Sequence, residues 1–327
     1  MRVVRVCAFA ALAFLIVQPA SCALPASCSQ GARAFSPCEL TFDWREGELP
    51  QSTSPYKDEA LNVEFRSPQH ITYLIRPFWN GGHTLHVRFT PTLAGTWTYH
   101  VSASIKRYDN QESSFNVAES GSPGFVDVAN LRHWWTTNKQ PHLWLSASTP
   151  FLEIDQPTFE SWLDARKHDG FTHVRGPLLT LRASLKPLSE NFQPDFAYFN
   201  ALDDRLLAAG GRGLTLDLLL ADQSFLASGL LGNREERDGL IRYLVARYGA
   251  LNVTWQGIEH FEDTADSRAL LKDLGSSLQK YDTYHHPRST DARVTSSPLL
   301  PDGWMNYLIE ASPHPKLGAV EHQFTQA

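Results

Sequence analysis

The feature that most constrains the fold is an alternation of apolar runs and amphipathic segments in the second half of the chain. The runs read FTHVRGPLL, LTLDLLLAD and NVTWQGIEHF, and the segments between them have the three- and four-residue spacing of helices. Runs that are apolar on both faces are typical of buried parallel strands, which need long crossover connections. About six such units follow one another without an early reversal, which favours a (β/α) barrel over an open sheet. We therefore predict a parallel α/β region over residues 139–327.

The chain before this region has a different rhythm. Short β-rich runs such as LNVEFRS, HTLHVRFTP and GTWTYHVSASI are separated by turn signals, including Asn80–Gly82 and Pro91–Gly95. Alternation with a period of two residues, interrupted by regular turns, predicts an antiparallel β-sandwich. We place this sandwich at residues 41–120. The sequence after it is rich in Gly, Ser and Pro, which predicts a linker over residues 121–138.

The N-terminus has the pattern of a secretory signal peptide. Two arginines precede a run of twelve apolar residues, and small residues fit cleavage after residue 23. The apolar run is too short for a membrane span of about 20 residues. Cys22 leaves a lipoprotein anchor as an alternative, although Pro19 stands where such anchors have an aliphatic residue. We predict a signal peptide over residues 1–23, an extension over 24–40, and a secreted or periplasmic protein.

Charge and cysteine content narrow the classes of partner and cofactor. Removal of residues 1–23 takes away two basic residues and no acid, so the formal net charge goes from −6 to −8. Nucleic acid is a poor partner for such a surface, because phosphate binding needs clustered Lys and Arg. Cys28 and Cys38 predict one disulfide in an exported chain, with two free thiols as the alternative. No metal-ligand spacing or phosphate loop occurs, so we predict neither a metal nor a cofactor, and the oligomeric state stays open.

One apolar run ends in acids rather than in a turn. Glu259 follows NVTWQGI directly, and Glu262 lies three residues further on. In (β/α) barrels the active site lies where the strands end and the loops begin. Glycoside hydrolysis needs two carboxyl groups, one to protonate the leaving oxygen and one to attack the sugar or to activate water. Glu259 is therefore the candidate proton donor of such a reaction.

Longer stretches resemble a known family. FWNGGHTLHVRFTPTLAGTWTYHV resembles the immunoglobulin-like domain that precedes apiosidase-like glycoside hydrolase barrels, with its Trp-x-Gly-Gly turn and Gly-x-Trp-x-Tyr strand. RYLVARYGALNVTWQGIEHFED and YDTYHHPRSTDARVTSSPLLPDGWMNYL resemble segments of the barrels themselves. The resemblance implies an immunoglobulin-like β-sandwich followed by a (β/α)8-type TIM barrel, a carbohydrate substrate, and the acid/base role for Glu259.

Two positions depart from the pattern of that family. Ile258 stands where many of these enzymes have an Asn that holds a substrate hydroxyl. Ser146–Ser148 replaces a Gly-Asp-Thr that related enzymes often show in their first strand. These departures either weaken the expectation of activity or indicate a different subgroup.

Seven further residues are candidates for substrate binding, because they lie near expected strand ends or carry groups that bind sugars. Each also has a structural alternative: an ion pair for the arginines and the histidine, a solvated helix start for the second glutamate, and core packing for the tryptophan. A lone buried aspartate within LTLDLLL would be costly without partners, which makes it a candidate for the barrel interior. The candidates are Glu262, Arg175, Asp217, Asp222, Trp255, His286 and Arg288.

The second carboxylate is harder to place. A retaining barrel puts its nucleophile on strand seven, whereas NYLIEAS predicts strand six and GAVEHQF the start of the next helix. The barrel is thus expected to be truncated at its C-terminus, and Glu310 and Glu321 are the acids of that tail. Two main hypotheses follow: a glycoside hydrolase, or a catalytically inactive carbohydrate-binding protein of the same fold. A third is an adhesion module built on the sandwich.

Overall fold

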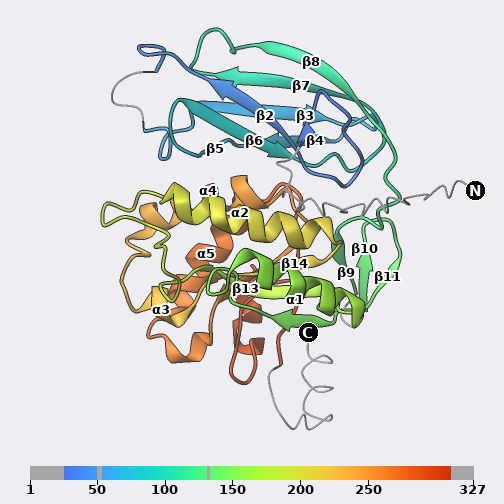
Figure 1. Ribbon diagram of the computed structural model, residues 1–327. Coiled ribbons are helices and arrows are strands. Elements are labelled where there is room, and N and C mark those ends of the chain that lie inside the picture. The colour runs from blue at the N-terminus through green and yellow to red at the C-terminus, as the bar shows by residue number, and fades with distance from the viewer. Residues whose placement is uncertain (1–25, 50–53, 131–132, 311–327) are drawn as a thin grey trace, which may run out of the picture.

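The computed structural model describes residues 26–49, 54–130 and 133–310. The predicted signal peptide, the end of NYLIEAS and Glu321 lie outside these residues. Figure 1 shows layered antiparallel strands packed above an α/β region, with a small sheet beside that region. A β part therefore precedes a parallel α/β part, as predicted from the sequence.

Two four-stranded sheets form the N-terminal sandwich, with the orders β1–β2–β6–β5 and β4–β3–β7–β8. All their pairings are antiparallel except that of β1 with β2. Phe65, Phe89 and Trp97 are fully buried between the sheets, and the rings of Phe65 and Phe89 stack with centroids 3.9 Å apart. The strands are β1 (Ala26–Ser27), β2 (Cys38–Asp43), β3 (Leu61–Arg66), β4 (Thr72–Ile75), β5 (Phe78–Trp79), β6 (Thr84–Phe89), β7 (Gly95–Ala103) and β8 (Gln111–Val117).

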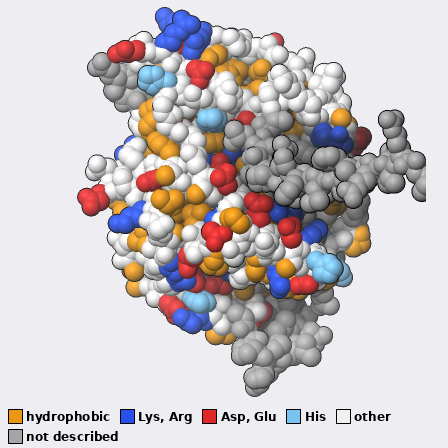
Figure 2. Space-filling model, in the orientation of Figure 1, with side chains coloured by type: hydrophobic (Ala, Val, Ile, Leu, Met, Phe, Trp, Pro, Cys, Tyr) orange, Lys and Arg blue, Asp and Glu red, His pale blue; other side chains and the backbone are white. Residues whose placement is uncertain are grey.

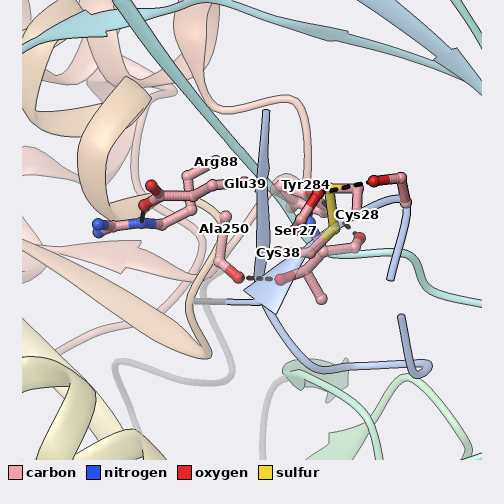
Figure 3. The surroundings of a disulfide bond; sticks show 9 residues. Ser27, Cys28, Cys38, Glu39, Arg88, Ala250 and Tyr284 are labelled. Atoms are coloured by element: carbon pink, nitrogen blue, oxygen red, sulfur yellow. Dashed lines mark hydrogen bonds and ion pairs between the residues drawn. A yellow bond between two sulfur atoms is a disulfide. The ribbon is translucent and has the colours of Figure 1, made fainter. Parts of the chain in front are cut away.

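A disulfide joins Cys28 to Cys38, as predicted. Cys28 directly follows β1 and Cys38 begins β2, so the bond closes the loop between these two strands. Figure 3 shows this region, in which Glu39 accepts a hydrogen bond from Nε of Arg88 at 2.7 Å. The crosslinked strands are thereby connected to a buried guanidinium group on β6.

The segment predicted as a linker, residues 121–138, differs from that prediction. It contains β9 (Val126–Asn130) and β10 (His133–Thr136), which form a three-stranded sheet with β11 (Pro141–His142). The Gly, Ser and Pro signal covers only the first residues of the segment, and the aromatic residues after it favour a strand. Trp134 of β10 packs against Trp144, with ring centroids 4.4 Å apart.

Five parallel strands in sequence order form the sheet of the α/β region. Every residue of β14 and β15 is buried, which agrees with runs that are apolar on both faces. The strands are β12 (Ser146–Ser148), β13 (His173–Leu179), β14 (Thr215–Ala221), β15 (Val253–Ile258) and β16 (Arg288–Ser289). The connecting helices are α1 (Gln156–His168), α2 (Phe196–Gly211), α4 (Arg234–Tyr248) and α5 (Ser267–Tyr281).

Side-chain caps explain where the long helices begin. Asp155 and Asp195 accept backbone amide hydrogen bonds at the first turns of α1 and α2. Asn233 and Glu236 form a capping box at the start of α4, which satisfies amides that have no partner within the helix. Among the described residues, no helix combines the length and apolarity needed to cross a bilayer.

The run NYLIEAS was predicted to be a strand, and its described residues, 306–310, do not form one. The amide of Asn306 donates to the carbonyl of Arg288 on β16 at 3.0 Å, but the next bond uses the side-chain Oδ1 of Asn306, at 2.6 Å from the Arg288 amide. The side-chain oxygen of Asn306 thus takes the place of a backbone carbonyl, and the backbone pairing with β16 does not continue. Further along, Thr295 and Glu310 form an isolated bridge, and the amide of Ser296 donates to the carbonyl of Ile309 at 2.9 Å.

A buried charge network holds the sandwich on the α/β region. Arg88 of β6 contacts Asp203 of α2 at 2.9 Å, and the other carboxylate oxygen of Asp203 accepts from Nε of Arg247 on α4 at 2.9 Å. Arg88 also donates to the backbone carbonyl of Arg247 at 2.6 Å. The Arg88 and Arg247 side chains are 2% and 0% exposed, so solvent does not screen these contacts. This network fixes where α2 and α4 lie under the sandwich.

Candidate active site

The C-terminal ends of the parallel strands and the loops after them surround an open cleft. Its empty volume, including the open mouth, is about 850 Å³. Active sites of (β/α) folds lie at this end of the strands. The cleft combines acidic and basic groups, and its titratable and charged lining consists of Glu153, Arg175, Arg182, Asp222, Glu259, His260 and Asp291.

Glu259 lies in this cleft, directly after β15. Its amide donates to the carbonyl of Ala221 at 3.0 Å, which extends the pairing of β14 and β15 by one residue and fixes the backbone. Its Oε2 accepts the amide of Gln223 at 2.9 Å and lies 3.3 Å from the guanidinium of Arg182. The Glu259 side chain is 21% exposed, so one face of the carboxylate is open to a ligand.

Asp222 lines the same cleft, but its oxygens are used by the protein. It caps the short helix α3 (Gln223–Leu226) by accepting the amide of Phe225 at 2.9 Å. It also accepts the hydroxyls of Ser224 and Thr180, each at 2.6 Å, and its side chain is 2% exposed. These contacts indicate that Asp222 holds the loops around Glu259 rather than a substrate.

Arg175 and Asp291 line the cleft, and Arg175 also pairs with Asp217, which is buried and absent from the cleft lining. Nε of Arg175 lies 3.6 Å from Asp217, and its terminal nitrogen lies 2.8 Å from Asp291. Asp217 also accepts hydrogen bonds from Thr254 at 2.8 Å and Gln256 at 3.0 Å. Burial raises the pKa of Asp217 above its ordinary value, although Arg175 and these hydrogen bonds oppose the rise. Asp217 is therefore a buried acid that contacts the cleft through Arg175.

Three predicted substrate residues lie in the protein interior and away from the cleft. Trp255 is fully buried and donates from its indole nitrogen to Asp282 at 3.2 Å. His286 places Nδ1 3.0 Å from the same aspartate. Arg288 donates to the backbone carbonyls of Trp304 and His286 at 3.0 and 3.2 Å. Their polar groups serve the packing of α5 and the following loops, and the cleft lining does not include them.

Glu262 also lies outside the cleft lining. Its carboxylate accepts the amides of Arg293 and Val294 at 2.9 and 3.2 Å, so it clamps an exposed loop. Glu310 accepts a hydrogen bond from the Thr295 hydroxyl, is absent from the cleft lining, and so does not supply a second carboxylate there. Glu153 does line the cleft and is exposed. Among the described residues it has no side-chain hydrogen bond or ion pair.

Four charged or titratable residues of the cleft were not among the sequence candidates: Glu153, Arg182, His260 and Asp291. Arg182 and Glu153 lie in loops without any recognisable motif. His260 has φ of 42°, a left-handed backbone that is rare outside glycine, and no sequence signal marks it. Asp291 lies in HPRSTDA, which the sequence analysis could treat as a strand. An acid near the end of a predicted strand is the signal that selected Glu259, and the same signal could have selected Asp291.

Metal-ligating clusters and surface charge bear on the partners that the described residues could bind. They contain no group of three or more His, Cys, Asp or Glu side chains that could hold a metal ion. On the face in Figure 2, acidic and basic side chains are interspersed over the α/β region. That face lacks the extended basic patch that phosphate binding requires.

Comparison with known proteins gives one family match and several solved structures. A family model described as a domain of unknown function, DUF5060, matches residues 32–104, within the sandwich. No curated protein matches the chain. A protein of Bacteroides vulgatus ATCC 8482 described as a candidate glycoside hydrolase superposes with a TM-score of 0.70 at 20% identity, covering 80% of this chain and 56% of that one.

Two further solved structures share part of the fold. A glycoside hydrolase family 5 protein of Bacteroides vulgatus ATCC 8482 has a TM-score of 0.51 at 20% identity and covers 59% of this chain and 46% of that one. A structure described as a glycoside hydrolase has a TM-score of 0.51 at 18% identity, with 58% and 47% covered. The chain thus spans about half the length of the solved chains that it matches. At these identities the likeness establishes a shared fold.

Proposed function

We propose that this protein is an exported glycoside hydrolase that cleaves O-glycosidic bonds in a polysaccharide or oligosaccharide, with Glu259 as the general acid/base. The observation that carries the proposal is the position of Glu259: a partly exposed carboxylate at the C-terminal end of a parallel strand, in an open cleft. The shared fold with solved glycoside hydrolases supports the same reaction class. The disulfide and the N-terminal signal pattern support export.

The reaction requires Glu259 to be protonated when it faces the leaving oxygen. Without a ligand, Arg182 lies against its carboxylate. Arg182 is half exposed and belongs to a loop, so a sugar that enters the cleft can displace it. The acid form of Glu259 then donates its proton to the oxygen that leaves, while a second carboxylate attacks the sugar or activates water.

Glu153 is our candidate for the second carboxylate among the described residues. It follows β12 in the loop before α1, lines the cleft, and has an unengaged side chain. Asp222 and Asp291 are poorer candidates, because internal hydrogen bonds and ion pairs occupy them. The engagement of these two acids also favours a second candidate function, a carbohydrate-binding protein of the same fold that has no hydrolytic activity.

A hydrolysis screen on branched pectic and hemicellulosic oligosaccharides tests the proposal. We expect the wild-type protein to release sugar from at least one of them, and Glu259→Gln to reduce the rate about 10²–10⁴-fold, since general acid catalysis contributes that much. Glu64→Gln is the matched control, because Glu64 is exposed on β3 of the sandwich and should leave the rate unchanged. Binding of an oligosaccharide without release of sugar would support the carbohydrate-binding alternative instead.

A further inference from the structure

The backbone turns sharply at the residue after Glu259. His260 has φ of 42° and ψ of 68°, in the left-handed region. For a residue with a Cβ this conformation is strained relative to a glycine, so it persists only where the surroundings impose it. Backbone strain beside a cleft is typical of residues with a function, which makes the His260 side chain a candidate for one.

Several hydrogen bonds impose the turn. The His260 amide donates to Oδ2 of Asp291 at 2.9 Å, and the Phe261 amide donates to the backbone carbonyl of Asp291 at 3.2 Å. The Gln223 side chain donates to the carbonyls of both Glu259 and His260. Asp291 is itself held by Arg175 at 2.8 Å. Asp291 therefore determines both the direction of the His260 ring and the path of the chain that leaves Glu259.

The ring of His260 is placed to contact a ligand. Its side chain is 34% exposed and lines the cleft together with Glu259. Nε2 lies 3.5 Å from Oδ2 of Asp291, and Nδ1 has no hydrogen-bond partner among the described residues. The ring thus has an anchored side and a side with hydrogen-bonding capacity to spare.

The ion pairs of the cleft argue against an anionic ligand at this position. Arg175 is paired with Asp217 and Asp291, and Arg182 is paired with Asp222 and Glu259. Each arginine is shared between two acids, so an anionic ligand gains no unpaired cation there, whereas a neutral, hydroxyl-rich ligand needs none. An imidazole nitrogen can donate to or accept from a hydroxyl, depending on its tautomer.

We propose that His260 is a further substrate-contacting residue, whose ring hydrogen-bonds a hydroxyl of a neutral sugar, and that Asp291 is the positioning residue that holds it. This inference rests on the proposed function, because it names a contact of the same cleft. Glycine adopts the left-handed conformation without strain, so His260→Gly removes the ring and preserves the turn. His260→Asn also tolerates the turn and keeps a hydrogen-bonding group, whereas His260→Ala keeps the strain and loses the ring.

The experiment measures kcat and KM of these variants on the oligosaccharides that the wild type cleaves, with thermal unfolding of each as a check on folding. We expect His260→Gly to unfold at or above the wild-type temperature and His260→Ala below His260→Gly. We expect His260→Gly to raise KM about tenfold, as the loss of one good hydrogen bond does, and His260→Asn to restore part of that loss. Asp291→Asn should lower kcat/KM less than His260→Gly.

Two results would overturn the inference in different ways. If Glu259→Gln abolishes turnover while His260→Gly retains the wild-type kcat and KM, the ring makes no substrate contact and the proposed function stands. If the wild type neither cleaves nor binds any oligosaccharide of the panel in titration calorimetry, the proposed function fails and the sugar contact fails with it. In that case the order of unfolding temperatures still reports whether the left-handed turn exists.

Discussion

At the scale of single residues, whether a candidate side chain reaches the cleft depends on which face of its strand it occupies. β15 is buried on both faces, so its apolar pattern does not distinguish the interior of the sheet from the helix side. Gln256 bonds to Asp217 on one face, and Trp255 bonds to Asp282 on the other. The sequence predicted that Glu259 lies at the cleft, because Glu259 directly follows the apolar run. It could not predict which face of the sheet Trp255 occupies, because Trp255 lies within that run.

The buried acid Asp217 gives the stability of the protein a testable pH dependence. The pKa of Asp217 in the folded protein lies above its ordinary value of 3.8, mainly because of burial. An acid whose pKa is higher in the folded than in the unfolded state stabilises the folded protein at pH values below its unfolded pKa. This stabilisation is lost as the pH rises through the pKa of the folded state. Asp217→Asn does not ionise, so its stability relative to wild type should increase from pH 4 to pH 7.

Urea unfolding of both proteins at several pH values checks this expectation. The side-chain oxygen of the Asn can still accept the hydrogen bond from Thr254, and Arg175 is still paired with Asp291. The variant should therefore fold. A stability difference that stays constant, or that moves against the variant as the pH rises, would contradict a raised pKa of Asp217 in the folded protein.

At the scale of elements, the sequence predicted the long helices and the central strands, because their periodicity extends over many residues. It failed on the described part of NYLIEAS, where five residues are too few for a period to appear and one Asn side chain ends the pairing. It also failed on β9 and β10, where turn-forming residues and strand-forming aromatic residues lie side by side. Short segments whose state depends on a single contact were the ones that could not be predicted.

Two helical glycines test how closely the elements pack. A Cβ on Gly275 of α5 would lie 2.3 Å from the Trp304 ring, whereas a Cβ on Gly239 of α4 would meet no atom within 4 Å. Gly275→Ala should destabilise the protein by about 1–3 kcal/mol through overpacking. Gly239→Ala should stabilise it by about 0.5–1 kcal/mol, because Ala has the higher helix propensity. Chemical denaturation measures both, and a stabilised Gly275→Ala would contradict the packing of α5 against Trp304.

At the scale of the whole molecule, the sandwich and the α/β region share one buried network. Burial opposes ionisation of Asp203, but Arg88 and Arg247 outweigh it and hold its pKa below the ordinary value. The sequence did not predict the pairing of Arg88, Asp203 and Arg247, because they are far apart in the chain and each lies in an ordinary strand or helix. The arrangement of the two parts was for this reason unpredictable, although each part was predicted separately.

Asp203→Asn should destabilise the whole molecule. The variant removes the carboxylate that pairs with the buried Arg247, whereas Arg88 keeps Glu39, and breaking such a buried pair costs about 3–5 kcal/mol. We expect calorimetry to show a single transition for the wild type, because the network couples the two parts, and a lower transition temperature for the variant. Asp204→Asn, at the exposed neighbouring position, should change stability by less than about 1 kcal/mol. Two separate wild-type transitions would contradict the coupling.

The most direct test of Glu259 as a proton donor varies the leaving group. The measurement is kcat/KM of wild type and Glu259→Gln on an oligosaccharide and on a dinitrophenyl glycoside of the same sugar, whose phenolate leaves without protonation. Our account predicts a loss of about 10²–10⁴-fold on the oligosaccharide and a loss at least tenfold smaller on the aryl glycoside. Equal losses on both substrates, or no loss on either, would contradict it.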